Sequence, residues 1–249
     1  VKTPAEAHGV DLLFVCTKYT QLRDSLPDIE AITGEHTMVV SLLNGVDSEE
    51  LIGQRIGMEH MIYSLIRIAS HRIGNSIHFS LPKGYNGIYI GIPNQTASQD
   101  PRLASIAEIF ADTPVTLHLS DDILLDMWDK FGLNVSRNLP QAILGVGIGV
   151  YDDSIYADAI MRKMRHEVVL VANAKGIPLT DEFKAAKWLP SQRYSTLQDL
   201  DAHRHTEIDM FSGALIRMGK EVGVECPYNE MTYNLIKALE EKNDGKFDY

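Results

Sequence analysis

The sequence predicts an α/β fold for the first half of this 249-residue chain and an all-helical second half. Two short unbroken apolar runs, Asp11–Thr17 and Thr37–Leu43, are typical of strands buried on both faces of a parallel sheet. From about Ser120 the apolar residues recur instead with the 3.6-residue period of amphipathic helices. This change of period predicts an α/β domain over 1–119 and a helical domain over 120–249.

Short segments between and after the two apolar runs complete the predicted sheet domain. We expect a crossover helix over 21–32, interrupted at Pro27, and a second helix that begins after a cap at Ser48. Alternating strands and helices of this kind build the βαβ units of parallel sheets. Three further strands are predicted over 61–69, 75–81 and 86–92. The last two of these are expected to pair as a hairpin around Pro82–Gly84.

Glycine and proline residues divide the second half into separate helices. Breaks are expected at Gly176–Pro178, Pro190 and Gly223–Pro227, because these residues end or kink a helix. The predicted helices span 121–138, 153–175, 180–189, 196–222 and 227–242. Because ligand clefts favour junctions between domains, the boundary near residue 120 is a candidate region for a site.

The composition argues against two classes of partner. The chain carries 23 Lys and Arg against 34 Asp and Glu, a formal net charge of -11, and its basic residues form no cluster for phosphate backbones. No apolar run approaches the roughly 20 residues that span a bilayer, and no basic segment followed by an apolar one opens the sequence. We therefore expect a cytoplasmic protein that binds neither nucleic acid nor membrane.

Three polar residues, spaced four positions apart, interrupt an otherwise apolar stretch. Lys130, Asn134 and Asn138 lie on one face of a predicted α-helix. Apolar residues such as Trp128 and Phe131 cover most other directions, so we expect the polar face to pack against protein. An ammonium group and two amides in such surroundings indicate a functional site.

Polar residues also follow the first two predicted strands, and ligands of open parallel sheets bind beyond the carboxyl ends of strands. Lys18 follows the first strand, and Asn44 with Gly45 follows the second. Lys18 could pair with a phosphate or carboxylate, whereas Asn44 can donate and accept hydrogen bonds beside a glycine that permits close approach. The alternatives are a solvated lysine and an ordinary Asn-Gly turn.

A third polar cluster lies at the entrance of the fourth predicted helix. Ser195 and Glu207 are its candidate functional residues. The alternatives are that Ser195 caps the helix and that Glu207 is solvated or paired with Arg204. His203 and His205 lack the four-residue spacing of helical zinc ligands, so we assign no metal site.

Together these segments resemble the ketopantoate reductase family, NADPH-dependent enzymes that reduce 2-dehydropantoate to pantoate in pantothenate and coenzyme A biosynthesis. The resemblance spans nearly the whole chain. It is carried by 16–21 (CTKYTQ), 43–46 (LNGV), 128–140 (WDKFGLNVSRNLP), 195–199 (STLQD) and 204–209 (RHTEID). It implies a partial, Rossmann-like NADP-binding domain over 1–119 and a substrate-binding and dimerisation domain over 120–249.

The resemblance also implies a role for each candidate residue. Lys130 matches the general acid of the family, and Glu207 matches the glutamate that supports it. The residues implied in binding the small 2-oxo acid substrate are Asn44, Asn134, Asn138 and Ser195. Those implied on the NADPH side are Lys18, Gln21 and Asn44. This fits the chemistry, because hydride addition to a ketone builds charge on oxygen, which a lysine can meet with a proton.

The sequence departs from the family at its start, where the family has a strand and a glycine-rich turn that approaches the dinucleotide pyrophosphate. Segment 1–10 resembles the connection before the family's fourth strand, and Gly145–Gly149 has the wrong spacing to substitute. We therefore expect an N-terminally truncated chain with weakened NADPH affinity. An incomplete sheet also exposes an edge near 11–17, which makes pairing between chains and a homodimer plausible.

Three functional interpretations remain open from the sequence. The leading one is a ketopantoate reductase-like chain that retains its catalytic residues. The second is a reductase of another small 2-oxo acid, because architecture and a catalytic lysine do not choose the substrate. The third is a non-catalytic module for ligand binding or dimerisation, which the missing glycine-rich turn favours.

Overall fold

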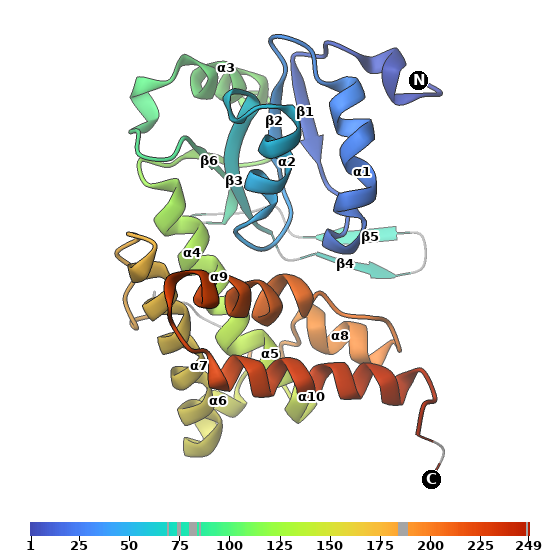
Figure 1. Ribbon diagram of the computed structural model, residues 1–249, viewed down its shortest axis with the longest axis vertical. Helices are drawn as coiled ribbons and strands as arrows, with labels where there is room; N and C mark the ends of the chain where they lie inside the picture. The colour runs from blue at the N-terminus through green and yellow to red at the C-terminus, as the bar shows by residue number, and fades with distance from the viewer. Residues whose placement is uncertain (69, 74–75, 80–83, 85, 184–188, 248) are drawn as a thin grey trace. The chain divides into compact units, whose positions relative to one another are not determined.

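The computed structural model describes residues 1–249 except 69, 74–75, 80–83, 85, 184–188 and 248. The chain forms two compact units, Val1–Met127 and Trp128–Tyr249. The first contains a sheet with helices and the second is helical, so the predicted fold class is confirmed (Figure 1). The division between the units falls inside a helix that starts at Ile123.

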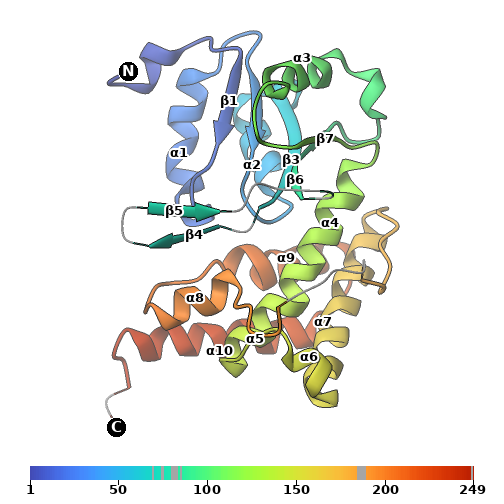
Figure 2. The ribbon, with the colours of Figure 1, turned by 180° about the vertical axis from the view of Figure 1, so that it is seen from behind.

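A five-stranded sheet organises the first unit (Figures 1 and 2). In chain order its strands are β1 (Leu12–Val15), β2 (Met38–Ser41), β3 (Met61–Arg67), β6 (Gly87–Gly91) and β7 (Leu117–Leu119). The spatial order is β1-β2-β3-β6-β7, and β1 to β3 are parallel, as predicted. β6 runs antiparallel to β3 and parallel to β7, so the complete sheet is mixed. β1 stands at an edge of the described sheet, in agreement with the expectation of an edge there.

The predicted hairpin between 75–81 and 86–92 is wrong. β4 (Ser70–Ile73) and β5 (Ser76–Phe79) form a separate antiparallel pair, whereas β6 pairs with β3. The side chains of β5 are exposed. β6 instead contributes Ile88 and Ile90 to the core, and burial of these side chains accounts for its place in the large sheet. Most of the expected turn lies outside the described residues.

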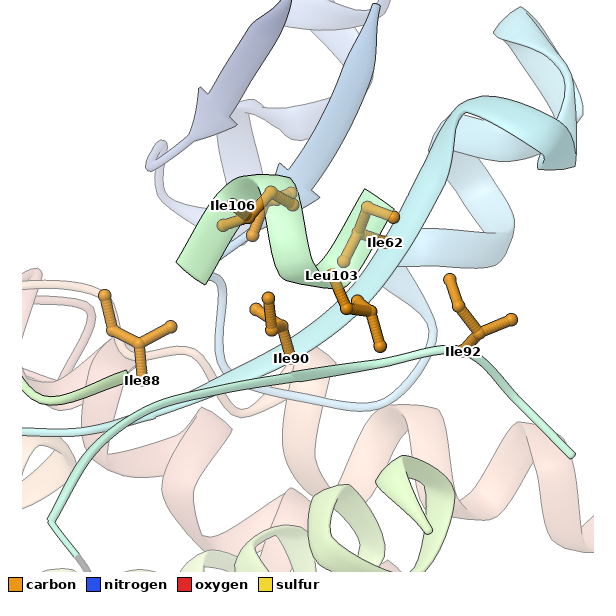
Figure 3. Packing of buried hydrophobic residues seen from close by; sticks show 7 residues of the cluster. Ile62, Ile88, Ile90, Ile92, Leu103 and Ile106 are labelled. Carbon is orange, nitrogen blue, oxygen red and sulfur yellow. The ribbon is translucent and has the colours of Figure 1, made fainter. Parts of the chain in front are cut away.

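Helices cover both faces of this sheet. α1 (Tyr19–Ile32) packs beside α2 (Ser48–Ile56), and α2 lies over the face of β3 that presents Met61. α3 (Pro101–Phe110) covers the opposite face, because neighbouring residues of a strand point in opposite directions. Figure 3 shows side chains of α3 packed against isoleucines of β3 and β6. The buried cluster comprises Val40, Ile62, Ile88, Ile90, Ile92, Leu103 and Ile106.

Two local predictions in this unit need correction. α1 continues through Pro27 without interruption, because the fixed backbone angle of proline fits a helix and this turn is exposed. Ser48 is the first residue of α2 and not its cap, a position that Asp47 occupies. The Ser48 hydroxyl instead lies 2.8 Å from the hydroxyl of Ser41, the last residue of β2. The described residues of this unit also form three short 3₁₀ turns, at Pro4–Ala7, Met58–His60 and Ala97–Gln99.

The second unit consists of helices in the part of it that the structure describes. They are α4 (Ile123–Leu133, which begins in the first unit), η4 (Asn134–Asn138), α5 (Leu139–Leu144), α6 (Val150–Asp153), α7 (Ile155–Ala174), α8 (Ser195–Asp201), η5 (Asp209–Gly213), α9 (Ala214–Val222) and α10 (Pro227–Asn243). η4 and η5 are π-helical turns. α7 is the longest, and it packs against η4, α6, α9 and α10.

The continuous helix predicted over 196–222 is wrong, because α8 ends at Asp201 and α9 begins only after η5. The intervening segment contains His203 in a left-handed conformation (φ 52°). The helix predicted over 180–189 is not formed at 180–183, and 184–188 lie outside the described residues. Within the described chain, we find no helix with the length and apolarity needed to cross a bilayer.

Candidate functional site

The helix that carries the polar stripe changes its winding in the middle of the stripe. Lys130 lies in α4, whereas Asn134 and Asn138 are the first and last residues of η4, whose hydrogen bonds join residues five apart. The spacing predicted that the three residues share one continuous α-helical face, and this prediction is wrong. Asn138 is 2% exposed, and Lys130 and Asn134 are partly exposed. The expected packing against protein thus holds fully for Asn138 alone.

Two side chains explain why the helix widens at this point. Pro140 has no N–H to donate to the carbonyl oxygen of Ser136, as an α-helix would require. The Ser136 hydroxyl also donates to the carbonyl oxygen of Gly132 at 2.7 Å, which competes with the ordinary backbone pattern. The π-helical turn thus follows from the local sequence.

Asn138 joins this turn to the start of α8. Its Nδ2 donates to the hydroxyl oxygen of Ser195 at 3.3 Å, and its Oδ1 accepts from the backbone N–H of Thr196 at 3.2 Å. Gln141 holds the residue just before α8 in the same way, because its Oε1 accepts from the backbone N–H of Tyr194 at 2.8 Å. Ser195 is exposed and lies within α8, so it is not the helix cap. The structure thereby brings together two candidate residues from distant parts of the sequence.

A buried ion pair supports the turn that carries Lys130. Arg165 of α7 is 1% exposed, and its Nη2 lies 3.1 Å from Oδ1 of Asp129. Its guanidinium also donates to the backbone carbonyls of Asp129 and Thr180. Gly132 makes room for this group, because a Cβ there would lie 2.2 Å from Nη1 of Arg165. Sequence reasoning missed this pair, since nothing in the sequence marks an arginine as buried.

Glu207 lies in the irregular segment between α8 and η5. Its backbone carbonyl accepts from the N–H groups of Met210 and Phe211, and its side chain is partly exposed. Arg204, the partner considered from the sequence, instead pairs with Asp199 at 2.8 Å. η5 packs against η4, so the segments that carry Glu207 and the two asparagines are neighbours within the second unit.

The candidates on the cofactor side lie in the first unit, beyond the carboxyl ends of β1 and β2. Lys18 caps the N-terminus of α1 through its backbone and is exposed, as is Gln21 one turn later. Asn44 is partly exposed and precedes Gly45, whose φ of 96° favours glycine. The hydroxyl of Tyr19 donates to Asp47 at 2.7 Å and ties the two strand-end segments together.

A buried carboxyl group lies in the first turn of α2, five residues after Asn44. Glu49 is 1% exposed and accepts a 2.8 Å hydrogen bond from the hydroxyl of Ser48, which in turn contacts Ser41. Burial raises the pKa of Glu49 to about 7, although the hydrogen bonds from Ser48 and from backbone groups act in the opposite direction. Sequence reasoning missed Glu49, because an acidic residue in the first turn of a helix is ordinarily solvated.

Two family models match this chain. The model for ketopantoate reductase PanE/ApbA matches residues 1–95, and the model for ketopantoate reductase PanE/ApbA C terminal matches residues 122–240. The chain belongs to the ketopantoate reductase family. The resemblance on which the sequence analysis relied is therefore confirmed over both halves of the chain.

Curated relatives agree with this family. The 2-dehydropantoate 2-reductase of Streptococcus pyogenes serotype M3 is 29% identical over 253 residues, which cover 96% of this chain and 80% of that protein. The 2-dehydropantoate 2-reductase of Caulobacter vibrioides is 26% identical over 244 residues, with 95% and 80% covered. The chain thus spans about four fifths of the length of these ketopantoate reductases.

Solved structures share the fold. A PanE/ApbA family ketopantoate reductase from Ralstonia eutropha superposes with a TM-score of 0.81 at 25% identity, covering 97% of this chain and 79% of that one. D-mandelate dehydrogenase in complex with NADH and anilino(oxo)acetate gives a TM-score of 0.82, also at 25% identity, with 97% and 80% covered. Both similarities extend across the α/β unit and the helical unit.

Proposed function

We propose that this chain is an NADPH-dependent reductase that converts 2-dehydropantoate to pantoate in pantothenate and coenzyme A biosynthesis. The observation that carries the proposal is the contact between Asn138 and Ser195. Two residues implied in substrate binding, 57 positions apart in the sequence, meet in the structure of a chain whose family performs this reaction. An amide and a hydroxyl at one place suit the hydroxyl and carboxylate groups of a small 2-oxo acid.

Each candidate residue has a role in this proposal. NADPH, when bound, would supply the hydride, which would leave negative charge on the carbonyl oxygen of the substrate. Lys130 donates the proton to that oxygen, and Glu207 supports the lysine as its acidic partner. The proposed substrate-binding residues are Asn44, Asn134, Asn138 and Ser195.

The strand ends of the first unit suit a dinucleotide. The hydroxyl oxygen of Thr17 is buried there and has no hydrogen-bond partner among the described residues. Lys18, next in the chain, offers a positive charge for a phosphate, and Gly45 permits close approach of the backbone. We assign Lys18, Gln21 and Asn44 to the cofactor side, and domains 1–119 and 120–249 to cofactor binding and to substrate binding with dimerisation. A homodimer in the cytoplasm belongs to the same proposal.

A reductase of another 2-oxo acid is the second candidate. It is favoured by one specific observation, because D-mandelate dehydrogenase bound to NADH and anilino(oxo)acetate superposes as well as a ketopantoate reductase does. The aryl group of that ligand and the branched aliphatic chain of ketopantoate differ in shape, so they require substrate pockets of different shape. Pocket shape, not the catalytic lysine, therefore separates the two candidates.

The test is a titration of the 249-residue chain with NADPH, followed by cofactor fluorescence and then by the loss of nicotinamide absorbance when a 2-oxo acid is added. Ketopantoate, benzoylformate and pyruvate are compared side by side, each with NADPH and NADH. We expect the highest kcat/KM for ketopantoate with NADPH. A higher value for benzoylformate would favour the second candidate, and no turnover of any acid would contradict both.

A further inference from the structure

One face of α10 forms hydrogen bonds with the chain on both sides of Glu207. Tyr233, Lys237 and Glu240 lie at positions i, i+4 and i+7 of this helix, which places them on one face. Glu240 is 2% exposed, and its Oε1 accepts from both the backbone N–H and the hydroxyl of Thr206, each at 2.7 Å. The residue immediately before Glu207 is therefore fixed through main chain and side chain together.

The other side of Glu207 is held at Asp209. The hydroxyl of Tyr233 donates to Oδ1 of Asp209 at 2.7 Å, and Nζ of Lys237 lies 3.8 Å from its Oδ2. Lys237 also donates to Oε2 of Glu240 at 2.8 Å, which links the two anchors. Glu207 thus stands between two fixed points that are three residues apart.

The anchor at Glu240 is charged. Burial raises the pKa of Glu240, but the hydrogen bonds from Lys237 and Thr206 outweigh it and hold the pKa below its usual value. His205 adds a third group, with Nδ1 3.6 Å from Oε2. Hydrogen bonds to an ionised carboxylate are roughly twice as strong as neutral ones, so the Glu240 carboxylate holds Thr206 more firmly than a neutral acceptor would.

We propose that Tyr233, Lys237 and Glu240 are positioning residues that fix Glu207 for its role beside Lys130. The inference rests on the proposed function of Glu207 and extends it to residues of α10. The segment 202–208 forms no helix or strand, although the carbonyl of Glu207 accepts from the N–H groups of Met210 and Phe211. Without the anchors at Thr206 and Asp209, the backbone that carries the Glu207 carboxylate would sample more conformations. Positioning of this kind matters because small displacements of a catalytic group lower turnover strongly.

A double-mutant cycle between Glu240 and Glu207 tests the proposal. Glu240→Gln keeps the shape and one oxygen acceptor but removes the charge. We expect kcat for ketopantoate to fall about tenfold, with KM changed less than twofold. In a Glu207→Gln background the same substitution should lower kcat by less than twofold, because the group that it positions is gone. An equal fall in both backgrounds would overturn the proposal.

Amide hydrogen exchange supplies a readout that does not depend on activity. We expect the Thr206 and Glu207 amides to exchange about tenfold faster in Glu240→Gln, and Tyr233→Phe to loosen the segment more mildly by removing one hydroxyl. Glu241→Gln is the matched control, since Glu241 is the next residue of α10 and pairs with Lys246 instead. Unchanged exchange at Thr206 in Glu240→Gln would overturn the positioning role, even if the wild type reduced no 2-oxo acid and the proposed function failed separately.

Discussion

Replacing Glu49 by glutamine tests whether the first unit buries an ionisable group in the first turn of α2. The carboxyl is 1% exposed, and burial raises its pKa from 4.5 to about 7. Below pH 4.5 it is protonated in the folded and the unfolded chain alike. Between pH 4.5 and 7 the folded chain keeps a proton that the unfolded chain releases, so the free energy of unfolding falls as the pH rises.

The expected size of this effect follows from the pKa. One pKa unit corresponds to about 1.4 kcal/mol, so a rise from 4.5 to about 7 corresponds to about 3 kcal/mol of stability that is lost as the pH rises from 4.5 to 7. Glutamine has the same shape and does not titrate. The free energy of unfolding of Glu49→Gln, relative to wild type, should therefore rise by about 2–3 kcal/mol from pH 5 to pH 8. Any constant cost of the amide leaves this difference unchanged.

The assay must report on the first unit. The sequence of the first unit, 1–127, contains no tryptophan, so tryptophan fluorescence would follow the wrong transition. Amide exchange of the buried strand residues Val40 and Ile62, compared between variant and wild type at each pH, measures the opening of the first unit. Glu50→Gln is the control, since it makes the same change at an exposed neighbour. Parallel pH profiles of Glu49→Gln and wild type would refute the reasoning.

Three further predictions concern the second unit. Lys130→Ala should lower kcat by about 100-fold or more while KM changes little, because the proton is needed in the transition state; an unchanged kcat in steady-state assays would remove the lysine from the mechanism. Gly132→Ala should destabilise the second unit by about 1–3 kcal/mol in urea unfolding followed by tryptophan fluorescence, because its methyl group would collide with Arg165. Asn138→Ala should speed amide exchange in the first turn of α8, which loses two hydrogen bonds, and raise KM; normal exchange there would contradict this structural role.

Local pattern was sufficient for several elements of this fold. β1 and β2 follow from short runs of apolar residues, which are typical of strands in parallel sheets. β1 stands at the sheet edge and is only partly buried, so full coverage on both faces was wrong for this strand. α10 follows from Pro227 at its first turn and from the helical period after it. The candidate site residues, in contrast, followed from polar side chains in apolar surroundings and at strand ends, but their roles followed only from short motifs of a known family, because no periodicity distinguishes a catalytic lysine from a solvated one.

Other features depend on contacts that no local window contains. The break between α8 and η5 is stabilised by Glu240, which lies 34 positions from the Thr206 that it binds. The partner of β6 is decided by burial against α3, and not by the nearer strand β5. The π-helical turn at Asn134 escapes detection for another reason, since one extra residue in a turn leaves the apolar period almost unchanged.

The two π-helical turns also constrain how the length of this chain can vary. A π-helical turn holds one residue more than an α-helical turn, so η4 and η5 each behave as a one-residue insertion in a longer helix. Because such a turn takes up the extra residue locally, deleting one residue from η4 would restore α-helical winding and leave the direction of Lys130 relative to α5 almost unchanged. A deletion within α4, between Lys130 and the start of η4, would instead rotate the lysine by about 100° relative to α5. In this protein, single-residue changes in length are therefore better tolerated within 134–138 than within the preceding turn of α4.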